Sequence, residues 1–197
     1  NVLIPRPETE ELVEWIIKDV RSTMPDLHCS ILDIGTGSGC IPISLKRELP
    51  HTNVTAIDVS EKALQIAKKN AEELDAEIDF LQIDFLDESK WKALPQFDII
   101  VSNPPYIPFR EKEKLAKNVT AFEPGVALFV EDKNPFIFYE KIVTLAKNHL
   151  KQKGKIYVEV NEEYAERIKV IFENTGFISE IKKDMYGKER MVSAAFI

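Results

Sequence analysis

Three glycines stand at alternate positions within residues 33–39, whose sequence is Asp-Ile-Gly-Thr-Gly-Ser-Gly. They follow a short apolar run and lead into a helical pattern, so the backbone can turn sharply and bring a ligand to the N–H groups of a helix start. The dinucleotide fingerprint has its third glycine one position later, where this chain has Cys40, and no Lys-Ser or Lys-Thr pair follows as in a P-loop. The glycines alone would also fit a tight strand-to-helix turn. We interpret the loop as a site for a nucleotide-like ligand, formed by Gly35, Thr36, Gly37, Ser38 and Gly39.

Acidic residues end the next two apolar runs. Asp58 lies 19 residues after Gly39 (58 − 39), where the two oxygens of a carboxylate can accept hydrogen bonds from two ribose hydroxyls. Asp84 offers a carboxylate to an exocyclic amino group, and the ring of Phe85 can pack against a purine face. Each Asp alone would also fit a helix cap or turn, and Phe85 alone a core residue. Together the three residues predict an adenosine pocket without a pyrophosphate site.

The segment Asn103-Pro104-Pro105-Tyr106 follows the fourth apolar run. Its two prolines remove two backbone donors, so the carbonyls and the Asn103 amide oxygen remain as acceptors. Two acceptors suit the two hydrogens of an NH₂ group, and Tyr106 provides a flat surface for a planar group. The lone pair of an amide or aryl amine is delocalised, so a methyltransferase must aim that nitrogen at the methyl carbon. The segment predicts such an acceptor site, and a proline-rich turn that caps a strand is the alternative.

Short runs rich in β-branched residues alternate with longer stretches at helical spacing, which is typical of an α/β fold with a parallel sheet covered by helices. Strands are predicted over residues 31–34, 54–57, 78–83, 97–101, 155–160, 177–183 and 191–196. Helices are predicted from Pro7 to about Val20 and over 40–49, 61–74, 135–150 and 162–174, with Ser60 as an N-cap and a turn at 151–154. The three motifs follow the carboxyl ends of successive strands, where open α/β sheets bind ligands. Residues 103–134 are predicted to be a long loop that serves the site.

Length and composition fit one globular domain, since the chain has 197 residues, of which 44% are hydrophobic and 30% charged. The 33 acidic and 26 basic side chains give a net charge of −7, which disfavours binding to nucleic acid. No run approaches the roughly 20 apolar residues that cross a bilayer, and Arg and Glu stand near the start where a signal peptide would be apolar. We therefore expect a cytoplasmic protein with no membrane partner. Two cysteines and three scattered histidines predict neither a disulfide scaffold nor a metal site.

The sequence resembles the class I S-adenosylmethionine-dependent methyltransferases, and most closely the HemK/PrmC family of peptide chain release factor glutamine N5-methyltransferases. Nearly the whole chain takes part in the resemblance. The motifs that carry it are Leu3 to Glu10, Ile31 to Ile41, Asp84-Phe85, Phe97 to Pro108, Glu123-Pro124 and the late turn Lys183 to Gly187 with Arg190.

The resemblance implies a seven-stranded, mostly parallel sheet with helices on both faces and strand order 3-2-1-4-5-7-6. It implies S-adenosyl-L-methionine as cofactor, S-adenosyl-L-homocysteine as product, and no metal. The glycine loop, Asp58, Asp84, Phe85 and Asn103 would bind the cofactor. The substrate would be the glutamine of the Gly-Gly-Gln loop of a release factor, held by Asn103, Pro104, Pro105 and Tyr106. Asn103 and the carbonyl of Pro104 would accept its two N–H hydrogens, and Tyr106 would pack against it.

Three alternatives remain open. Enzymes that methylate a glutamine of a ribosomal protein share the tetrapeptide but typically carry Ser where this chain has Pro7-Glu8-Thr9. N6-adenine or N2-guanine methylation of nucleic acid would use the same acceptor geometry, and a non-catalytic binding domain is the third alternative. The chain departs from the family at 130–134 and at Asn161, which replaces a common glycine. The family's small helical N-terminal domain has no match, so we expect residues 1–197 to be a monomeric catalytic domain that binds release factors more weakly.

Overall fold

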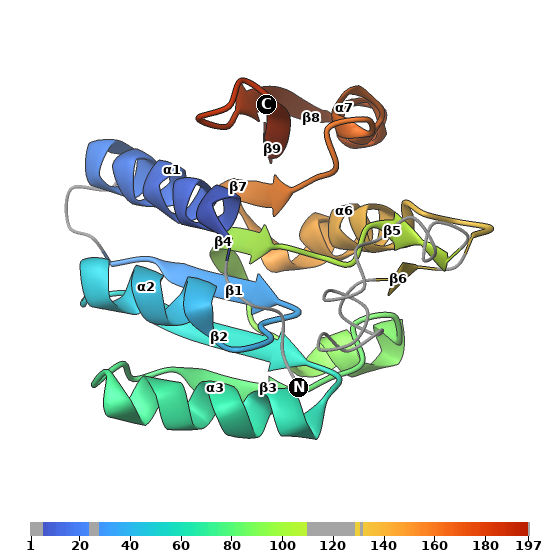
Figure 1. Cartoon of the computed structure of the whole chain (residues 1–197). Coiled ribbons are helices and arrows are strands. Elements are labelled where there is room, and N and C mark those ends of the chain that lie inside the picture. Colours follow the sequence, from blue (N-terminus) through green and yellow to red (C-terminus); the bar gives the residue numbers. More distant parts are fainter. Residues whose placement is uncertain (1–5, 24–27, 110–128, 131, 197) are drawn as a thin grey trace.

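A seven-stranded sheet forms the centre of the computed structural model, which describes residues 6–23, 28–109, 129–130 and 132–196. The strands lie in the order β3-β2-β1-β4-β7-β9-β8 (Figure 1), and β9 runs antiparallel to both β7 and β8. Their bounds are β1 Ser30–Ile34, β2 Asn53–Asp58, β3 Asp79–Gln82, β4 Phe97–Ser102, β7 Leu150–Glu159, β8 Phe177–Lys183 and β9 Glu189–Phe196. Counted among these seven alone, the order is 3-2-1-4-5-7-6, so the predicted topology is confirmed. Residues 3–5 and 123–124 of the motifs lie outside the described residues.

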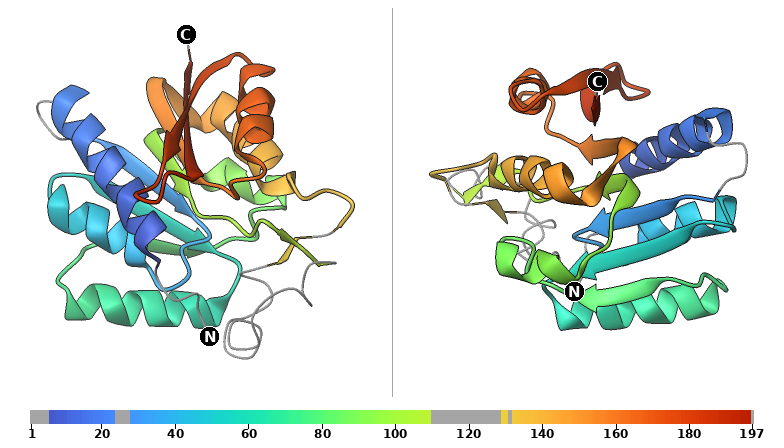
Figure 2. Two further views of the ribbon diagram at one scale, coloured as in Figure 1. Left: turned by 45° about the horizontal axis from the view of Figure 1, so that its top comes forward. Right: turned by 180° about the vertical axis from the view of Figure 1, so that it is seen from behind.

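Helices cover both faces of the sheet. The helices α1 (Pro7–Thr23), α2 (Cys40–Glu48) and α3 (Glu61–Glu73) lie on the near face in Figure 1. Helix α6 (Ile137–His149) covers the opposite face in the view from behind in Figure 2, followed along the chain by α7 (Ala165–Glu173). The described helices include none long and apolar enough to span a membrane.

The central strands are apolar on both sides, as expected for parallel strands between two helical layers. In β1, Ile31 belongs to the core under α1 and α2, whereas the next residue, Leu32, belongs to the core under α6. The same alternation occurs in β4, where Ile99 faces α1 and α2 and Ile100 faces α6. Each of these strands therefore contributes side chains to both cores.

The helix starts follow the local signals of the sequence. Glu8 and Glu10 lie in the first turn of α1, where negative charge is favoured by the helix dipole. The Ser60 hydroxyl accepts a hydrogen bond from the backbone N–H of Ala63 at 3.2 Å, so its predicted role as the N-cap of α3 is confirmed.

The predicted turn at 151–154 is wrong, because these residues form a bulge inside β7. Phe97 pairs with Leu150 and Ile99 pairs with Lys155, so four residues of β7 stand opposite Asp98 alone. A Cβ at Gly154 would lie 2.9 Å from the Asp98 carbonyl oxygen, so only glycine fits this close approach.

Two parts of the fold were not predicted. A short 3-10 helix, η1, spans Glu88–Ala93. Within the predicted long loop, β5 (Ile107–Pro108) and β6 (Phe129–Val130) pair in parallel as a second, two-stranded sheet. Both strands are too short to produce a recognisable alternation in the sequence.

Candidate active site

The glycine loop joins the carboxyl end of β1 to α2 and is tied to the neighbouring strand. The backbone N–H groups of Gly35 and Thr36 donate to the Ile57 carbonyl at 2.9 and 3.0 Å. Gly35, Gly37 and Gly39 have φ angles of 74°, 56° and 81°, in the left-handed region that favours glycine. The loop is therefore shaped by its glycines as predicted.

Two of these glycines make a matched pair for mutation. At Gly39 a Cβ would lie 3.0 Å from the Cβ of Ala67 and 3.1 Å from Cδ1 of Ile43, whereas at Gly35 it would meet nothing within 4 Å. We expect Gly35→Ala to lower the free energy of unfolding by about 1–2 kcal/mol, the cost of the left-handed backbone. Gly39→Ala should lower it by roughly 2–4 kcal/mol, since crowding adds to that cost. Urea unfolding of the cofactor-free protein measures both, and equal losses would contradict the packing argument.

Asp58 ends β2 and uses both oxygens of its carboxylate within the protein. Oδ2 accepts from the Gly37 N–H at 2.9 Å, and Oδ1 accepts from the Ser60 N–H at 2.8 Å. The carboxylate thus fixes the glycine loop relative to the start of α3. Each oxygen keeps lone-pair capacity for a second donor, and the contact with ribose hydroxyls stays a prediction. Val59, the next residue, is 45% exposed and adds an apolar surface at this edge.

Asp84 and Phe85 follow β3, at the same edge of the sheet. The exposed Asp84 accepts a hydrogen bond from the Leu86 N–H at 3.0 Å, so it shapes the turn. The ring of Phe85 is only 5% exposed and stacks on Trp91 and Phe138, with centroid distances of 5.3 and 6.3 Å. In this conformation the ring belongs to the core, and the predicted contacts of both residues with a purine stay predictions.

Asn103 leaves the sheet next to the glycine loop. Ile34 of β1 pairs with Ser102 of β4, and the Ser102 hydroxyl donates to the Ile34 carbonyl at 2.8 Å. Gly35 and Asn103 therefore follow adjacent strand ends. The Asn103 Nδ2 donates to the hydroxyl of Thr9 in α1 at 3.2 Å. The structure thus brings together the two motifs that the sequence separates by more than sixty residues.

The rest of the tetrapeptide is packed into the protein. Pro104 is buried, and Pro105 and Tyr106 are half-buried. Burial, with a smaller contribution from Glu159, raises the pKa of Tyr106 to about 12. Its phenol therefore stays neutral and can present a ring face without carrying charge.

Asp33, the last polar residue before the glycine loop, has a fully buried carboxylate. Neither of its oxygens is in good hydrogen-bond geometry with a described donor, and the nearby Thr36 hydroxyl, which interacts with it only weakly, has no other partner among the described residues. Burial raises the pKa of Asp33 to about 7; the Asp58 carboxylate adds to the rise, and Thr36 opposes it only partly. An unpaired buried carboxylate is costly for the fold. It therefore fits a ligand that brings positive charge.

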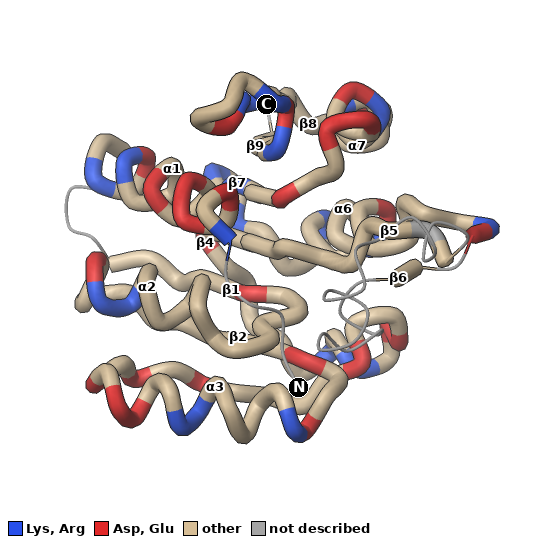
Figure 3. Tube along the Cα trace, in the orientation of Figure 1, with Lys and Arg blue, Asp and Glu red and all other residues tan. Residues whose placement is uncertain are grey.

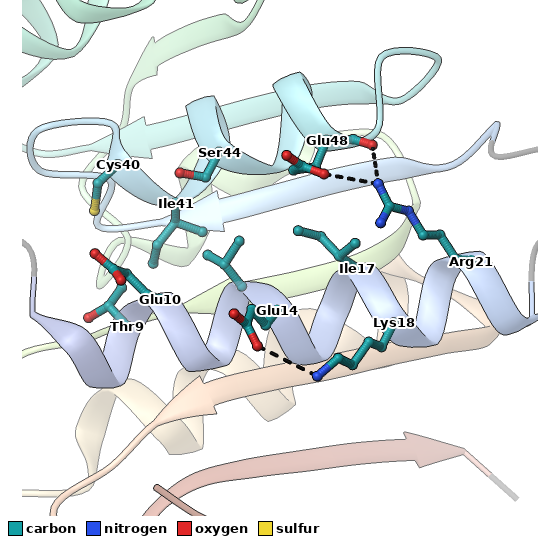
Figure 4. Close-up of a pocket in the computed structure, with 11 residues that line it drawn as sticks. Thr9, Glu10, Glu14, Ile17, Lys18, Arg21, Cys40, Ile41, Ser44 and Glu48 are labelled. Atoms are coloured by element: carbon teal, nitrogen blue, oxygen red, sulfur yellow. Dashed lines mark hydrogen bonds and ion pairs between the residues drawn. The ribbon is translucent and has the colours of Figure 1, made fainter. Parts of the chain in front are cut away.

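A groove of about 670 Å³ runs between α1 and α2. Figure 4 shows Thr9 and Cys40 at one end and Arg21 bound to Glu48 at the other, where Nη2 and Oε2 are 2.9 Å apart. The lining includes neither the glycines nor Asn103, so this groove lies beside the candidate site. In the described part of the chain, no group of three or more His, Cys, Asp or Glu side chains could hold a metal ion.

Comparison with known proteins decides the family. The chain is 47% identical over 197 residues to a release factor glutamine methyltransferase from Flavobacterium psychrophilum, covering 100% of this chain and 68% of that protein. It belongs to the release factor glutamine methyltransferase family. A member from Bacteroides thetaiotaomicron is 46% identical over 195 residues, covering 98% of this chain and 68% of the relative. The resemblance stated from the motifs is confirmed.

Two wider comparisons agree with the assignment to the release factor glutamine methyltransferase family. The model of the methyltransferase small domain matches residues 16–122. A solved structure of the T. thermophilus 16S rRNA N2 G1207 methyltransferase, in complex with AdoMet and guanosine, has a TM-score of 0.65. It is 18% identical and covers 98% of this chain and 44% of that one, so the likeness shows the fold alone. The fold is that of the S-adenosylmethionine-dependent methyltransferases.

The residues of the site fit S-adenosyl-L-methionine. Three left-handed glycines let the backbone approach a ligand closely, and the unpaired Asp33 carboxylate suits its ammonium group. Asp33 was not predicted as a candidate site residue because it lies within an apolar strand pattern. An acidic residue in the middle of such a buried run was the available signal.

Sequence reasoning also missed the partners of Asn103. The hydroxyl of Thr9 donates to Oε2 of Glu159, at the end of β7, at 2.6 Å. These residues are 150 positions apart, and no local pattern relates them. The sequence does offer a signal for Glu159, because it is an acidic residue at the end of an apolar strand pattern. It offers no comparable signal for Thr9.

Proposed function

We propose that this chain transfers a methyl group from S-adenosyl-L-methionine to the side-chain amide nitrogen of the glutamine in the Gly-Gly-Gln loop of peptide chain release factors. The observation that carries the proposal is the position of Asn103-Pro104-Pro105-Tyr106 directly beside the glycine loop. The supporting finding is the high identity to proteins named for this activity. The partner is thus a protein, and the methyl acceptor is a neutral carboxamide.

The chemistry needs orientation more than proton transfer. When bound, S-adenosyl-L-methionine supplies a methyl group made electrophilic by its positively charged sulfur. Asn103 Oδ1 and the Pro104 carbonyl accept the two N–H hydrogens of the glutamine, which fixes the direction of the nitrogen lone pair. Tyr106 packs against the planar amide, and the buried Pro104 helps to keep water out of this corner. Gly35, Thr36, Gly37, Ser38 and Gly39 would hold the cofactor, with Asp33 at its ammonium group.

The cofactor's nucleoside would lie along the edge formed by β2 and β3. Asp58 would accept from ribose hydroxyls, and Asp84 would accept from the adenine amino group. Val59 and Phe85 offer the apolar surface for the base.

A labelling assay tests this function. The chain is incubated with methyl-labelled S-adenosyl-L-methionine and a release factor, beside a copy of that factor whose Gly-Gly-Gln glutamine is replaced by alanine. We expect label in the first and none in the second. Equal labelling of both would refute the proposed acceptor.

The same assay can test the two alternative substrates, ribosomal proteins and nucleic acid. Ribosomal proteins and ribosomal RNA are offered in place of the release factor, and label in either one alone would favour that substrate. In Figure 3, α1 carries acidic residues along its first half and basic residues only near its end, whereas Lys alternates with Glu along α3. Without a continuous basic stripe on these helices, we expect no strongly salt-dependent binding to RNA.

A further inference from the structure

A chain of two hydrogen bonds links three elements behind the candidate acceptor site. Asn103, after β4, donates from Nδ2 to Thr9 Oγ1 in α1 at 3.2 Å. Thr9 donates from Oγ1 to Glu159 Oε2, at the end of β7, at 2.6 Å. We propose that Thr9 and Glu159 are positioning residues that hold the Asn103 amide with Oδ1 as the acceptor for the substrate. This inference rests on the proposed function.

The burial of these groups is not explained by the fold. Thr9 is 5% exposed and Glu159 only 2%, so the carboxylate is withdrawn from water. The backbone of Glu159 is held without its side chain. Its carbonyl oxygen accepts a hydrogen bond from the Tyr139 hydroxyl at 3.1 Å, and Glu159 pairs with Met191 of β9 in the sheet. An apolar side chain would serve this position at lower cost. Arg6 and Arg190 offset part of this cost, and we assign the carboxylate to the Thr9 hydroxyl, which donates to it.

The number of protons fixes the orientation of the amide. A threonine hydroxyl has one hydrogen, and that hydrogen is donated to Glu159. Thr9 Oγ1 can then only accept from its other neighbour, so Asn103 must turn its NH₂ group toward Thr9. The one acceptor of the amide, Oδ1, is left for an N–H of the substrate. If the Asn103 amide were flipped, its NH₂ group would face the NH₂ group of the glutamine. Two donors cannot form a hydrogen bond, so the glutamine amide would not be bound.

This orientation depends on the charge of Glu159. A protonated carboxyl can donate to Thr9, whose own hydrogen is then free for Asn103 Oδ1, so both amide orientations become possible. Burial raises the pKa of Glu159 to about 7, which places this change near neutral pH. The charged and titratable groups that face Glu159 are Arg6 and Glu8 at the start of α1, Arg190 on β9, Tyr106, Tyr139 and Cys40.

The test compares three variants with the wild type. Thr9→Val removes the hydroxyl and keeps the shape of the side chain, and Thr9→Ser restores the hydroxyl. Tyr157→Phe is the matched control, because the Tyr157 hydroxyl donates to Asp19 Oδ2 at 2.6 Å and likewise joins β7 to α1, away from Asn103. All three are measured for turnover, for S-adenosyl-L-methionine affinity by calorimetry and for melting temperature.

We expect Thr9→Val to lower kcat by about 10- to 100-fold, the effect of a misdirected reacting group. Cofactor affinity should stay within about twofold, since in the described part of the chain these two hydrogen bonds do not involve the glycine loop. Thr9→Ser should recover most of the turnover. Tyr157→Phe should lower the melting temperature about as much as Thr9→Val and leave kcat unchanged. Equal kcat losses in Thr9→Val and Tyr157→Phe would mean a purely structural role and would overturn the proposal.

A pH profile tests the carboxylate directly. With saturating cofactor and substrate, wild-type kcat should fall as the pH drops through about 7 and then level off at a lower plateau, because protonated Glu159 permits both orientations of the Asn103 amide. Glu159→Gln cannot titrate, so this acid limb should disappear. An unchanged acid limb in Glu159→Gln would refute the role of Glu159.

A measurement without substrate separates this inference from the proposed function. The side-chain NH₂ signal of Asn103 in the cofactor-free protein should exchange slowly with water in the wild type and in Thr9→Ser, and quickly in Thr9→Val. This holds whether or not a release factor is methylated. Equal exchange in all three proteins would show that Thr9 does not hold the amide.

Discussion

Replacing Asn103 by alanine is expected to lower methyl transfer by about 100-fold or more while S-adenosyl-L-methionine affinity changes by no more than about twofold. The side chain supplies one of the two acceptors for the substrate amide, and without it the nitrogen is no longer aimed at the methyl carbon. Among the described residues its side chain hydrogen-bonds to Thr9 and not to the glycine loop, so the cofactor site should persist. Single-turnover rates and calorimetric cofactor titration measure the two quantities.

The control for this variant is Asn148→Ala, which removes an exposed asparagine near the end of α6. It should match the wild type in both measurements. Loss of cofactor binding and turnover together in Asn103→Ala would mean that Asn103 mainly shapes the cofactor site, and the acceptor role would be wrong.

Replacing Asp33 by asparagine is expected to weaken S-adenosyl-L-methionine binding and to stabilise the cofactor-free protein. The carboxylate is fully buried without a hydrogen-bond partner, so its charge is unfavourable until a cationic ligand arrives. Loss of a charge-assisted hydrogen bond worth about 1.5–3 kcal/mol corresponds to a roughly 10- to 100-fold weaker affinity. The same change removes a buried charge from the empty protein.

The stabilisation should depend on pH with a definite sign. Burial raises the pKa of Asp33 to about 7, so the folded protein holds this proton more tightly than the unfolded chain, where the pKa is about 4. The contribution of Asp33 to the wild-type free energy of unfolding therefore falls as the pH rises from about 4 to about 7. The gain from Asp33→Asn should be about 2–3 kcal/mol larger at pH 8 than at pH 5. Urea unfolding at both pH values measures it, and a gain independent of pH would show that Asp33 is not a buried acid of raised pKa.

The helices and strands could be predicted because the burial of each element dictates a pattern of apolar and polar residues along the sequence. The runs 31–34 and 97–101 are apolar on both sides, and this is what a central parallel strand requires. Their observed bounds extend the predicted ones by one residue each, to Ser30 and Ser102. The bulge at 151–154 was misread because Lys-Gln-Lys-Gly is typical of a turn, and only the pairing with β4 keeps it within a strand.

The parts of the candidate site that could be predicted are those formed by residues next to one another in the sequence. The loop from Gly35 to Gly39 and the tetrapeptide at 103–106 act through their own backbone geometry, which short sequences encode. Asp58 was predicted to be near the cofactor, but its bonds to Gly37 and Ser60 follow from how β1 and β2 pair. The link from Asn103 through Thr9 to Glu159 joins three elements far apart in the chain, and it exists only once the sheet and α1 have packed together.

The most direct test of the acceptor site is a crystal structure with S-adenosyl-L-homocysteine and a peptide containing Gly-Gly-Gln. We expect the glutamine side-chain nitrogen to lie within about 3.2 Å of both Asn103 Oδ1 and the Pro104 carbonyl oxygen and to point at the sulfur atom of the product. A glutamine bound elsewhere, or residues 103–106 turned away from that sulfur, would contradict it.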